Sequence, residues 1–533
     1  MTQRHSVVLS LISILGAPLA ACGDDRAGVD ADALATSDSA VPDSVGGDAT
    51  TAASDTTSAP DAGQSVLQHH RSATRDGLYV VPGLDRAAAA GVHRDEGFSA
   101  SIDGPTYAHP LYWDAGAGGQ DLVIVATEQA SVYALDASTG AVVWQRSLGT
   151  PMPLAQLPCG NIDPLGVTGT PVIDPATRTL YVDAMLKVDG AAHHRIFALS
   201  LADGATVAGW PVDASSVSSG GVDFDAPVQN QRGALALFAG SLYVPYGGHY
   251  GDCGDYHGWV IGVPLADPAH PQAWATRAPG AGAWAPGGVS SDGASIFVST
   301  GNGFGSSSWS DQEAIIRLAP GPSFSQDEHD FWSPSDWKQL DNGDVDLGGS
   351  GPVLVTVAGA TPSALAVALG KDGKVYLVDR GDMGGVGDAV ASKLVASGPI
   401  ITSAAAYPTA GGADVVFRAS GRGCPDGQSG DLVAVAITAG APPSVSVAWC
   451  ASQDGTSSPI VTTTDGQAQS IVWTLGSEDS NQLRGFDGDT GAVVFAGGAA
   501  GALGAVNRFQ SAIVAKGRFY IAGRSSVVAF AIE

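Results

Sequence analysis

The sequence predicts an all-β fold, an eight-bladed β-propeller of four-stranded antiparallel blades. Three observations lead to this fold class. After about residue 75 the chain consists of short β-branched and aromatic runs separated by Gly, Asp, Ser and Pro, without helical periodicity. These runs fall into groups of four. One hairpin pattern also returns near the far end of the chain, and such a repeat indicates an architecture of similar units.

The repeated hairpin occupies residues 134–144, Ala-Leu-Asp-Ala-Ser-Thr-Gly-Ala-Val-Val-Trp, and returns in a looser form at 485–495. In both copies an alternating strand leads into an Asp-x-x-Thr-Gly turn, and a second strand leads to a large aromatic residue. Asp and Thr side chains can hydrogen-bond the turn backbone, and Gly supplies the conformational freedom. The pattern resembles the repeat of the pyrroloquinoline quinone (PQQ) type β-propellers, in which the aromatic residue docks one blade on the next.

The first, innermost strand of each group recurs as a segment of small and apolar residues. A seven-bladed ring is the alternative, because one first strand could be misread. The eight segments that predict eight blades are residues 104–113, 167–174, 232–239, 284–291, 351–357, 400–406, 458–463 and 509–515.

The two ends of the propeller are predicted to pair with each other. The last group, residues 509–533, has room for only three strands, while an extra strand at 97–102 precedes the first group. Pairing the extra strand with the last group closes the ring and removes two exposed sheet edges.

Residues 1–22 predict the signal peptide of a bacterial lipoprotein. A short cationic region precedes an apolar run at 7–15, and Leu-Ala-Ala-Cys resembles a lipobox in which Cys22 is acylated. An ordinary signal peptide with a chance cysteine is the alternative. Residues 23–74 are rich in Ala, Asp, Ser and Thr and predict a disordered acidic tether, which leaves 75–533 for the propeller.

These features predict an exported protein at the outer membrane, on its periplasmic or cell-surface face. No later segment has the ~18 apolar residues of a membrane span, so we expect membrane contact through the lipid anchor only. The formal net charge of −28 argues against nucleic acid as a partner, because phosphates require a basic surface.

The fold brings distant residues to one face. In a blade with strands A to D, the B–C and D–A connections emerge on the same face, which we name the top face. Trp284 opens the fourth blade and Asn302 follows its second strand, whereas Asp344 and Asp346 precede the fifth blade and Lys371 follows its second strand. We therefore expect these five residues to meet at the top, near the axis.

The same segments resemble the PQQ-dependent alcohol and glucose dehydrogenases, in the same order along the chain. The resemblance implies that Trp284 stacks under the quinone, that Asn302 ligates calcium and that Lys371 contacts the quinone oxygens. It also implies that Asp344 is the catalytic base, with Asp346 as a second carboxylate. Oxygen ligands suit calcium, and the ion and the lysine would polarise a quinone carbonyl.

Some features depart from that family. Its calcium-ligating Glu from the third blade has no clean counterpart, although Asp252 could replace it. The adjacent cysteine pair of many family members and a C-x-x-C-H haem motif are both missing from the sequence. The predicted calcium ligands are therefore Asn302, Asp252 and Asp344. Arginines predicted at the top could bind a carboxylate of the quinone or of an acidic ligand, or bridge loops: Arg232, Arg418, Arg422 and Arg508.

The predicted fold also favours one cysteine pairing. With lipid on Cys22, four of the five cysteines remain, and an even number in an exported chain suggests two disulfides. Cys159 and Cys253 occupy connections that reach the top near each other, and Cys424 and Cys450 belong to one blade. A four-cysteine zinc site is the alternative but lacks any C-x-x-C pair. His249 and His257 flank Cys253, where a disulfide-pinned loop is favoured over a metal site.

Two functions from different classes follow. The first is an envelope-anchored quinoprotein dehydrogenase that oxidises an alcohol or sugar hydroxyl with PQQ and calcium. The second is a non-catalytic propeller platform that binds a protein or glycan at the cell envelope.

Overall fold

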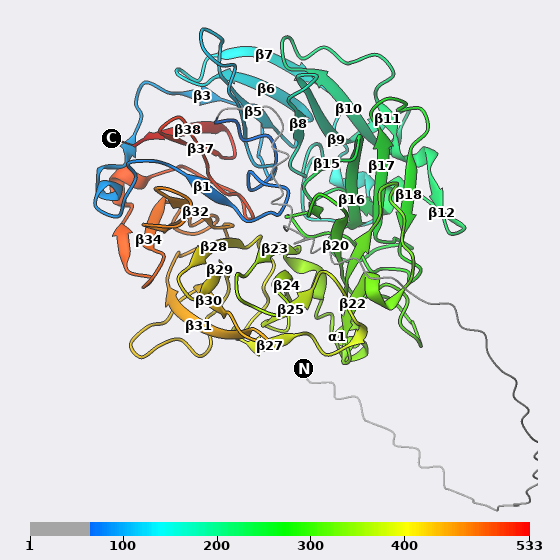
Figure 1. The fold of residues 1–533 in the computed structure, drawn as a ribbon. Coiled ribbons are helices and arrows are strands. Elements are labelled where there is room, and N and C mark those ends of the chain that lie inside the picture. The colour runs from blue at the N-terminus through cyan, green and yellow to red at the C-terminus, as the bar shows by residue number, and fades with distance from the viewer. Residues whose placement is uncertain (1–63, 533) are drawn as a thin grey trace, which may run out of the picture. The chain divides into compact units, whose positions relative to one another are not determined.

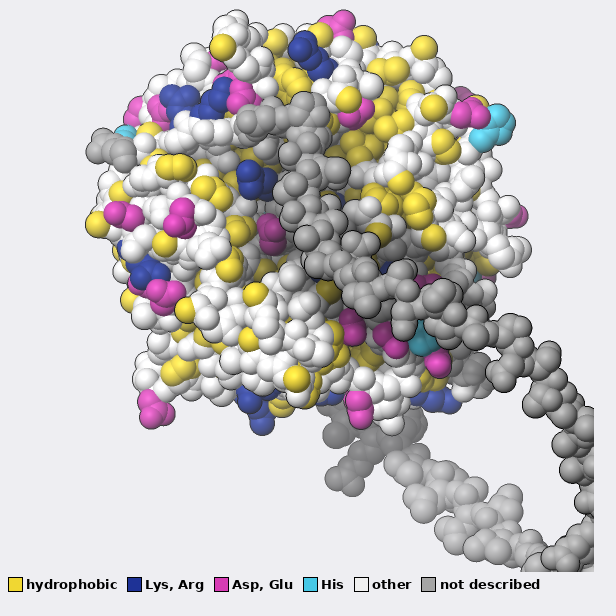
Figure 2. Space-filling model, in the orientation of Figure 1, with side chains coloured by type: hydrophobic (Ala, Val, Ile, Leu, Met, Phe, Trp, Pro, Cys, Tyr) yellow, Lys and Arg dark blue, Asp and Glu magenta, His cyan; other side chains and the backbone are white. Residues whose placement is uncertain are grey.

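The computed structural model describes residues 64–532 and confirms the eight-bladed β-propeller (Figure 1). The predicted signal peptide, Cys22 and most of the predicted tether lie outside the described residues. None of the helices in 64–532 has the length and apolar character needed to cross a membrane. On the face shown in Figure 2, basic side chains lie among acidic ones.

Blades 1 to 4 follow one another along the chain, and each predicted first strand is found. Their strands, from the axis outward, are β4 (Leu111–Trp113), β5 (Leu122–Ala126), β6 (Ser131–Asp136) and β7 (Val142–Ser147); β8 (Val172–Asp174), β9 (Thr179–Val188), β10 (Ala191–Ser200) and β11 (Val212–Asp213); β15 (Ala236–Phe238), β16 (Ser241–Gly248), β17 (Trp259–Pro264) and β18 (Gln272–Ala275); and β19 (Ser290–Ser291), β20 (Ile296–Thr300), β21 (Ala314–Leu318) and β22 (Phe331–Pro334).

Blades 5 to 8 complete the ring in the same order. Their strands are β23 (Val353–Thr356), β24 (Ala364–Leu369), β25 (Lys374–Asp379) and β27 (Ala391–Leu394); β28 (Ala405–Thr409), β29 (Gly412–Arg418), β30 (Leu432–Thr438) and β31 (Ser444–Ala451); β32 (Ile460–Thr463), β33 (Ile471–Thr474), β34 (Arg484–Asp487) and β35 (Val493–Phe495); and β36 (Ile513–Ala515), β37 (Arg518–Ala522) and β38 (Ser526–Ala531).

Further short elements lie outside the four-stranded blades. They are β14 (Gln229–Asn230) on β16, β26 (Gly385–Gly387) parallel to β22, the ribbon β12 (Ser218–Ser219) and β13 (Val222–Asp223), the helix α1 (Trp337–Gly343), and the 3₁₀ turns η1 (Ala88–Gly91), η2 (Leu154–Gln156), η3 (Ala214–Ser216), η4 (Ala226–Val228), η5 (Glu328–Asp330), η6 (Leu347–Gly349) and η7 (Gly498–Gly501).

The ring closes as predicted. β38 pairs antiparallel with β2 (His93–Arg94) and with β3 (Ala100–Ser101), so that Ala100 lies opposite Val527. The N-terminal part of the described chain therefore supplies the outer strand of blade 8, and no edge of that blade's β38 is left open to another chain.

The repeated hairpin docks neighbouring blades. The Asp136 carboxylate accepts hydrogen bonds from the backbone N–H of Ser138 at 3.0 Å and of Thr139 at 2.9 Å, and Gly140 takes a φ of 79°. Trp144 packs on the next blade and donates its indole N–H to the carbonyl of Leu201 at 2.9 Å. Its side chain thus belongs to the apolar layer between blades 1 and 2.

Ordered structure begins before the predicted boundary at residue 75. Residues 64–77, which we name the hub segment, lie at the axis, and the side chains of Val66, His69 and His70 are at most 2% exposed. Residues 64–74 differ in composition from the tether that precedes them. They include Val66-Leu67 and His69-His70, whose side chains can be buried. The domain boundary predicted at residue 75 is therefore corrected to about residue 64.

The hub segment hydrogen-bonds to all eight blades. Val66 pairs with Tyr112 of blade 1, and a side-chain carbonyl of Gln64 accepts from Lys516 of blade 8. Backbone carbonyls of the segment accept from the inner strands of blades 2, 4, 5, 6 and 7. These bonds run from the N–H of Ile173 to Leu67, Ser291 to Ala73, Leu354 to Thr74, Ala406 to Asp76 and Val461 to Gly77, at 2.7–2.9 Å.

Arg75 completes this set and reaches blade 3. Its guanidinium is buried and donates to the carbonyls of Leu235 and Val289, both at 2.9 Å, and to the carbonyl of His69. No carboxylate in residues 64–532 pairs with it. The hub segment then continues into β1 (Leu78–Val80), which pairs in parallel with β32.

Three histidines gather beside Arg75. The rings of His69 and His70 stack with centroids 4.2 Å apart, and His109 lies 4.2 Å from His69. Their ligand atoms are within 4.8 Å of one another. Burial lowers the pKa of His70 to about 3 and of His109 to about 4, and places that of His69 well below its usual range. The neighbouring Arg75 charge adds to this lowering for all three rings, so the histidines are neutral.

This burial predicts a loss of stability in acid. The unfolded chain protonates these histidines below their ordinary pKa of 6.5 and so binds more protons than the folded protein. We expect the free energy of unfolding to fall as the pH drops from about 6.5 to about 4, by up to ~1.4 kcal/mol per pH unit for each histidine. Urea denaturation of the H70Q variant should show a shallower pH slope.

His270 provides the control, because its side chain is 80% exposed. The H270Q variant should keep the slope of the natural protein. An unchanged slope in H70Q would show that the buried cluster does not set the acid sensitivity.

Candidate functional site

A cavity of about 760 Å³ opens at the top end of the axis. The inner strands begin at this cavity and end at the hub segment, which therefore lies beneath it. The structure brings together on its wall all seven residues predicted for catalysis, cofactor or metal: Arg232, Asp252, Trp284, Asn302, Asp344, Asp346 and Lys371.

A common position in the blades explains part of this wall. Asn302 follows the end of β20 by two residues, Lys371 follows β24 by two, and Arg524 follows β37 by two. Each second strand runs toward the top face, so the residue just beyond its end reaches the axis. Glu128 occupies the same position after β5. The sequence analysis missed Arg524, although a comparison of the blades at this position could have found it. Glu128 is buried, accepts the backbone N–H of Gly166 at 2.8 Å and does not line the cavity.

Glycine backbone packs closely against Trp284. A Cβ atom added to Gly247, Gly301 or Gly349 would lie 2.8–3.2 Å from the Trp284 side chain, so glycine is required for this close approach. The indole is half-buried and adjoins the cavity. The Arg232 guanidinium carbon lies 5.6 Å from the ring centroid and the Lys371 ammonium 5.5 Å from it.

Lys371 links the two aspartates of the Asp-x-Asp segment. Its ammonium forms ion pairs with Asp346 and, at 3.0 Å, with Asp344. Asp346 is buried and also accepts the backbone N–H of Asn302 at 2.7 Å, whereas the Asp344 side chain is 67% exposed. Burial lowers the pKa of Lys371, but Asp346 and Asp344 raise it above its usual value overall. Asp346 therefore has both oxygens engaged, and Asp344 remains accessible.

Acidic groups outnumber Lys371 in this half of the cavity. Glu313 is fully buried, accepts the N–H of Leu347 through one oxygen and leaves the other without a partner. Burial and then Asp346 raise its pKa well above the usual range. Burial and nearby carboxylates also raise the pKa of Asp341 to about 6 and that of Asp252. These shifts show that further negative charge is disfavoured here, and a bound cation would relieve the repulsion between the carboxylates.

The two predicted disulfides are present. Cys159 bonds to Cys253, and Cys424 bonds to Cys450. The first bond ties the connection after blade 1 to the loop that carries Asp252, whose carboxylate accepts the Tyr256 hydroxyl at 2.8 Å.

The two histidines beside Cys253 have different surroundings. His249 lines the cavity, and burial lowers its pKa to about 4, whereas His257 faces the carbonyl of Thr276 at 2.7 Å. Within 64–532, no set of three His, Cys, Asp or Glu ligand atoms within 4.8 Å includes either residue. This agrees with the expected disulfide-pinned loop.

The remaining wall is basic and comes mainly from blades 7, 8 and 1. Of the arginines predicted at the top, Arg508 lines the cavity together with Arg232, while Arg418 and Arg422 do not. The sequence analysis also missed Tyr107 and Glu478. These two carry no repeat signal, because they lie in loops whose lengths differ between blades.

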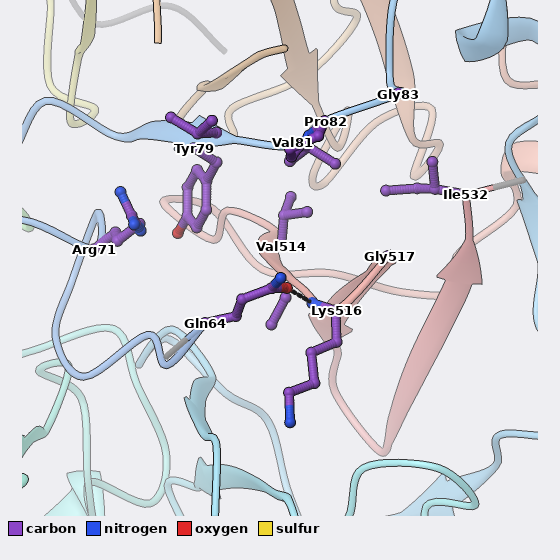
Figure 3. Close-up of a pocket in the computed structure, with 12 residues that line it drawn as sticks. Gln64, Arg71, Tyr79, Val81, Pro82, Gly83, Val514, Lys516, Gly517 and Ile532 are labelled. Atoms are coloured by element: carbon purple, nitrogen blue, oxygen red, sulfur yellow. Dashed lines mark hydrogen bonds between the residues drawn. The ribbon is translucent and has the colours of Figure 1, made fainter. Parts of the chain in front are cut away.

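A second, smaller cavity of about 260 Å³ lies beside β1 and the β36–β37 turn, at the opposite end of the inner strands (Figure 3). Figure 3 shows Tyr79, Arg71 and Lys516 among its lining residues. Lys516 is already paired with Asp114 and Asp121, and much of the wall is aliphatic. The axial cavity is therefore the candidate functional site.

Comparisons with known proteins show the fold. No protein-family model matches the chain, and no curated protein gives a significant match. Solved structures that match include the quinohemoprotein alcohol dehydrogenase from Comamonas testosteroni, at 15% identity over 89% of this chain and 81% of that one, with a TM-score of 0.58. The quinohemoprotein alcohol dehydrogenase ADHIIG from Pseudomonas putida HK5 matches at 12% identity over 88% and 80%, with a TM-score of 0.61.

A europium-containing methanol dehydrogenase is similar as well. It matches at 13% identity over 88% of this chain and 98% of its own, with a TM-score of 0.56. At these identities the likeness establishes a shared propeller fold, and the chemistry must be argued from the cavity.

We expect the buried Glu313 to lower the free energy of unfolding at high pH. For a carboxyl whose pKa is raised in the folded protein, the contribution to stability is fully present below the ordinary pKa of 4.5. It is lost as the pH rises toward the raised pKa of the folded state. At pH 8 the E313Q variant should therefore be more stable than the natural protein, by about 1–2 kcal/mol in urea denaturation. The change should shrink toward pH 5. The exposed E328Q variant is the control, and a destabilised E313Q at pH 8 would contradict this account.

Proposed function

We propose that the axial cavity binds a flat quinone of the PQQ type on Trp284 and that the protein oxidises an alcohol or sugar hydroxyl. The observation that carries this proposal is the Trp284 ring, which adjoins the cavity with two cationic side chains 5.5–5.6 Å from its centroid. Such a surface suits a planar, electron-poor ring that bears negative groups. The fold shared with quinoprotein dehydrogenases supports the same cofactor.

The residues around Trp284 would bind different groups of the quinone. Arg232 has no hydrogen-bond acceptor among residues 64–532, so its guanidinium is available for a quinone carboxylate. Lys371 is placed to donate to a quinone oxygen, and Asp346 holds the ammonium in position. When bound, the quinone would accept a hydride, which carries both electrons, from the substrate.

The predicted calcium ligands fit a cation by their chemistry. Asn302, Asp252 and Asp344 offer hard oxygen atoms, and a bound cation would favour the charged forms of Asp252 and Glu313, whose pKa values are raised in its absence. No three of the carboxylates here bring ligand oxygens within 4.8 Å of one another, and Lys371 pairs with two of them. A cation would compete with Lys371 for these oxygens, and when bound it would polarise a carbonyl oxygen.

Asp344 is the base that the geometry favours. Its carboxylate is exposed to the cavity and keeps free oxygen lone pairs, so it can take the proton of a substrate hydroxyl. Asp346, predicted as a second catalytic carboxylate, acts here as a positioning residue, since the Asn302 backbone and Lys371 occupy both oxygens.

Isothermal titration with PQQ tests the proposal. We expect binding at micromolar concentration or tighter, and at least tenfold weaker binding in W284A, because the stacking surface is lost. Chelation of calcium with EDTA should also weaken binding. W309A is a matched control, since Trp309 has Arg277 5.7 Å from its ring but does not line the cavity. No binding of PQQ at 10 µM, or equal loss in both variants, would favour the non-catalytic platform.

The cellular location remains part of the proposal. Two disulfides suit an exported protein, and Cys22 would carry the lipid. The natural protein should label with palmitate in a bacterial host and remain in the membrane fraction. The C22S variant should lose both properties, and a labelled C22S would refute the anchor.

A further inference from the structure

The wall of the axial cavity opposite the acidic residues has not been used by the proposed cofactor. It is formed by Arg508 and Arg524 of blade 8 and by Tyr107 of blade 1. Glu478 is the one carboxylate of this wall. We name Arg508 and Arg524 the arginine pair.

The arginine pair holds hydrogen-bond donors that the protein does not use. Arg524 donates its Nε–H to the side-chain oxygen of Asn507 at 2.7 Å, and within 64–532 its two Nη groups have no acceptor. Arg508 is held by Glu478 through Nε and Nη2, at 2.8–3.2 Å, which leaves Nη1 without an acceptor. A guanidinium with free N–H groups beside a cavity is suited to a carboxylate.

The surrounding chain fixes these side chains before any ligand arrives. Asn507, which orients Arg524, donates from its own amide to the carbonyl of Thr106 at 3.1 Å and is 2% exposed. The backbone N–H of Arg524 is bonded to Ala505. The donors are therefore preorganised, and little side-chain entropy is lost when they bind.

Three carboxylates of the cavity and the arginine pair come from different parts of the ring, although Lys371 lies among the former and Glu478 beside the latter. Asp252, Asp344 and Asp346 come from blades 3 to 5, whereas the arginine pair comes from blade 8. A volume of about 760 Å³ lies in the upper part of the range of small-molecule sites, which gives room for a second molecule beside a cofactor. A substrate with a hydroxyl at one end and a negative group at the other matches this pattern.

We infer that Arg508 and Arg524 bind the carboxylate of the substrate, so that the substrate class is an acidic alcohol of the sugar-acid type. This inference rests on the proposed function, because it assumes that Trp284 and Arg232 hold the quinone. The hydroxyl to be oxidised then lies toward Asp344, and the carboxylate lies on the arginine pair. The arginine pair could equally bind a carboxylate of the quinone. The experiment below distinguishes the substrate carboxylate from the quinone carboxylate.

The test compares D-glucuronate with D-glucose by isothermal titration. The natural protein should bind glucuronate at least tenfold more tightly than glucose, and higher salt should weaken only glucuronate. R508Q and R524Q should each weaken glucuronate at least tenfold and leave the affinity for PQQ unchanged. E478Q should bind glucuronate several-fold more tightly, because it frees Arg508. This gain cannot come from misfolding.

Arg484 supplies the matched control. It is also an arginine paired with one carboxylate, Asp454, but it does not line the cavity, so R484Q should bind glucuronate normally. Loss of PQQ affinity in R508Q or R524Q would assign the pair to the cofactor and overturn the inference. Equal affinity for glucuronate and glucose would overturn it too. Glucuronate binding by a natural protein that does not bind PQQ would refute the proposed function and leave the carboxylate site standing.

Discussion

The structure depends on the hydrogen bonds that the hub segment, residues 64–77, makes to the inner strands. The innermost strand of each blade presents backbone groups that no further strand of the blade can satisfy, and an unpaired buried amide is costly. One short segment supplies carbonyls, an amide side chain and the Arg75 guanidinium to all eight blades. It thereby fixes the blades relative to one another and fills the axis beneath the cavity.

The cavity is a consequence of this arrangement. With the axis filled below, the starts of the inner strands and the ends of the second strands converge above the hub segment. The chain places Trp284 there between glycines, with Arg232 and Lys371 near the ring. Behind this part of the wall, Glu313 is buried with one carboxyl oxygen that has no hydrogen-bond partner. Burial of Glu313 lowers the free energy of unfolding, and a ligand bound in the cavity would raise it again.

Much of the cavity wall was predictable because consecutive strands of a propeller blade run in opposite directions. Once the inner strands are recognised, the top connections follow, and they identified Trp284, Asn302, Asp344 and Lys371 as neighbours. The hub segment was missed because the burial of Val66, His69 and His70 depends on contacts with strands that lie far away in the sequence. The pairing of Lys371 with Asp346 joins the loops of two blades, and sequence spacing does not contain such a distance.

The central claim is that Trp284 is the floor of a quinone site, and a crystal structure of the protein soaked with PQQ tests it most directly. The account predicts a flat ring stacked on the indole, with one carboxylate at Arg232 and a ring oxygen at Lys371. A ring bound elsewhere, or a cavity that holds only water at saturating PQQ, would contradict it.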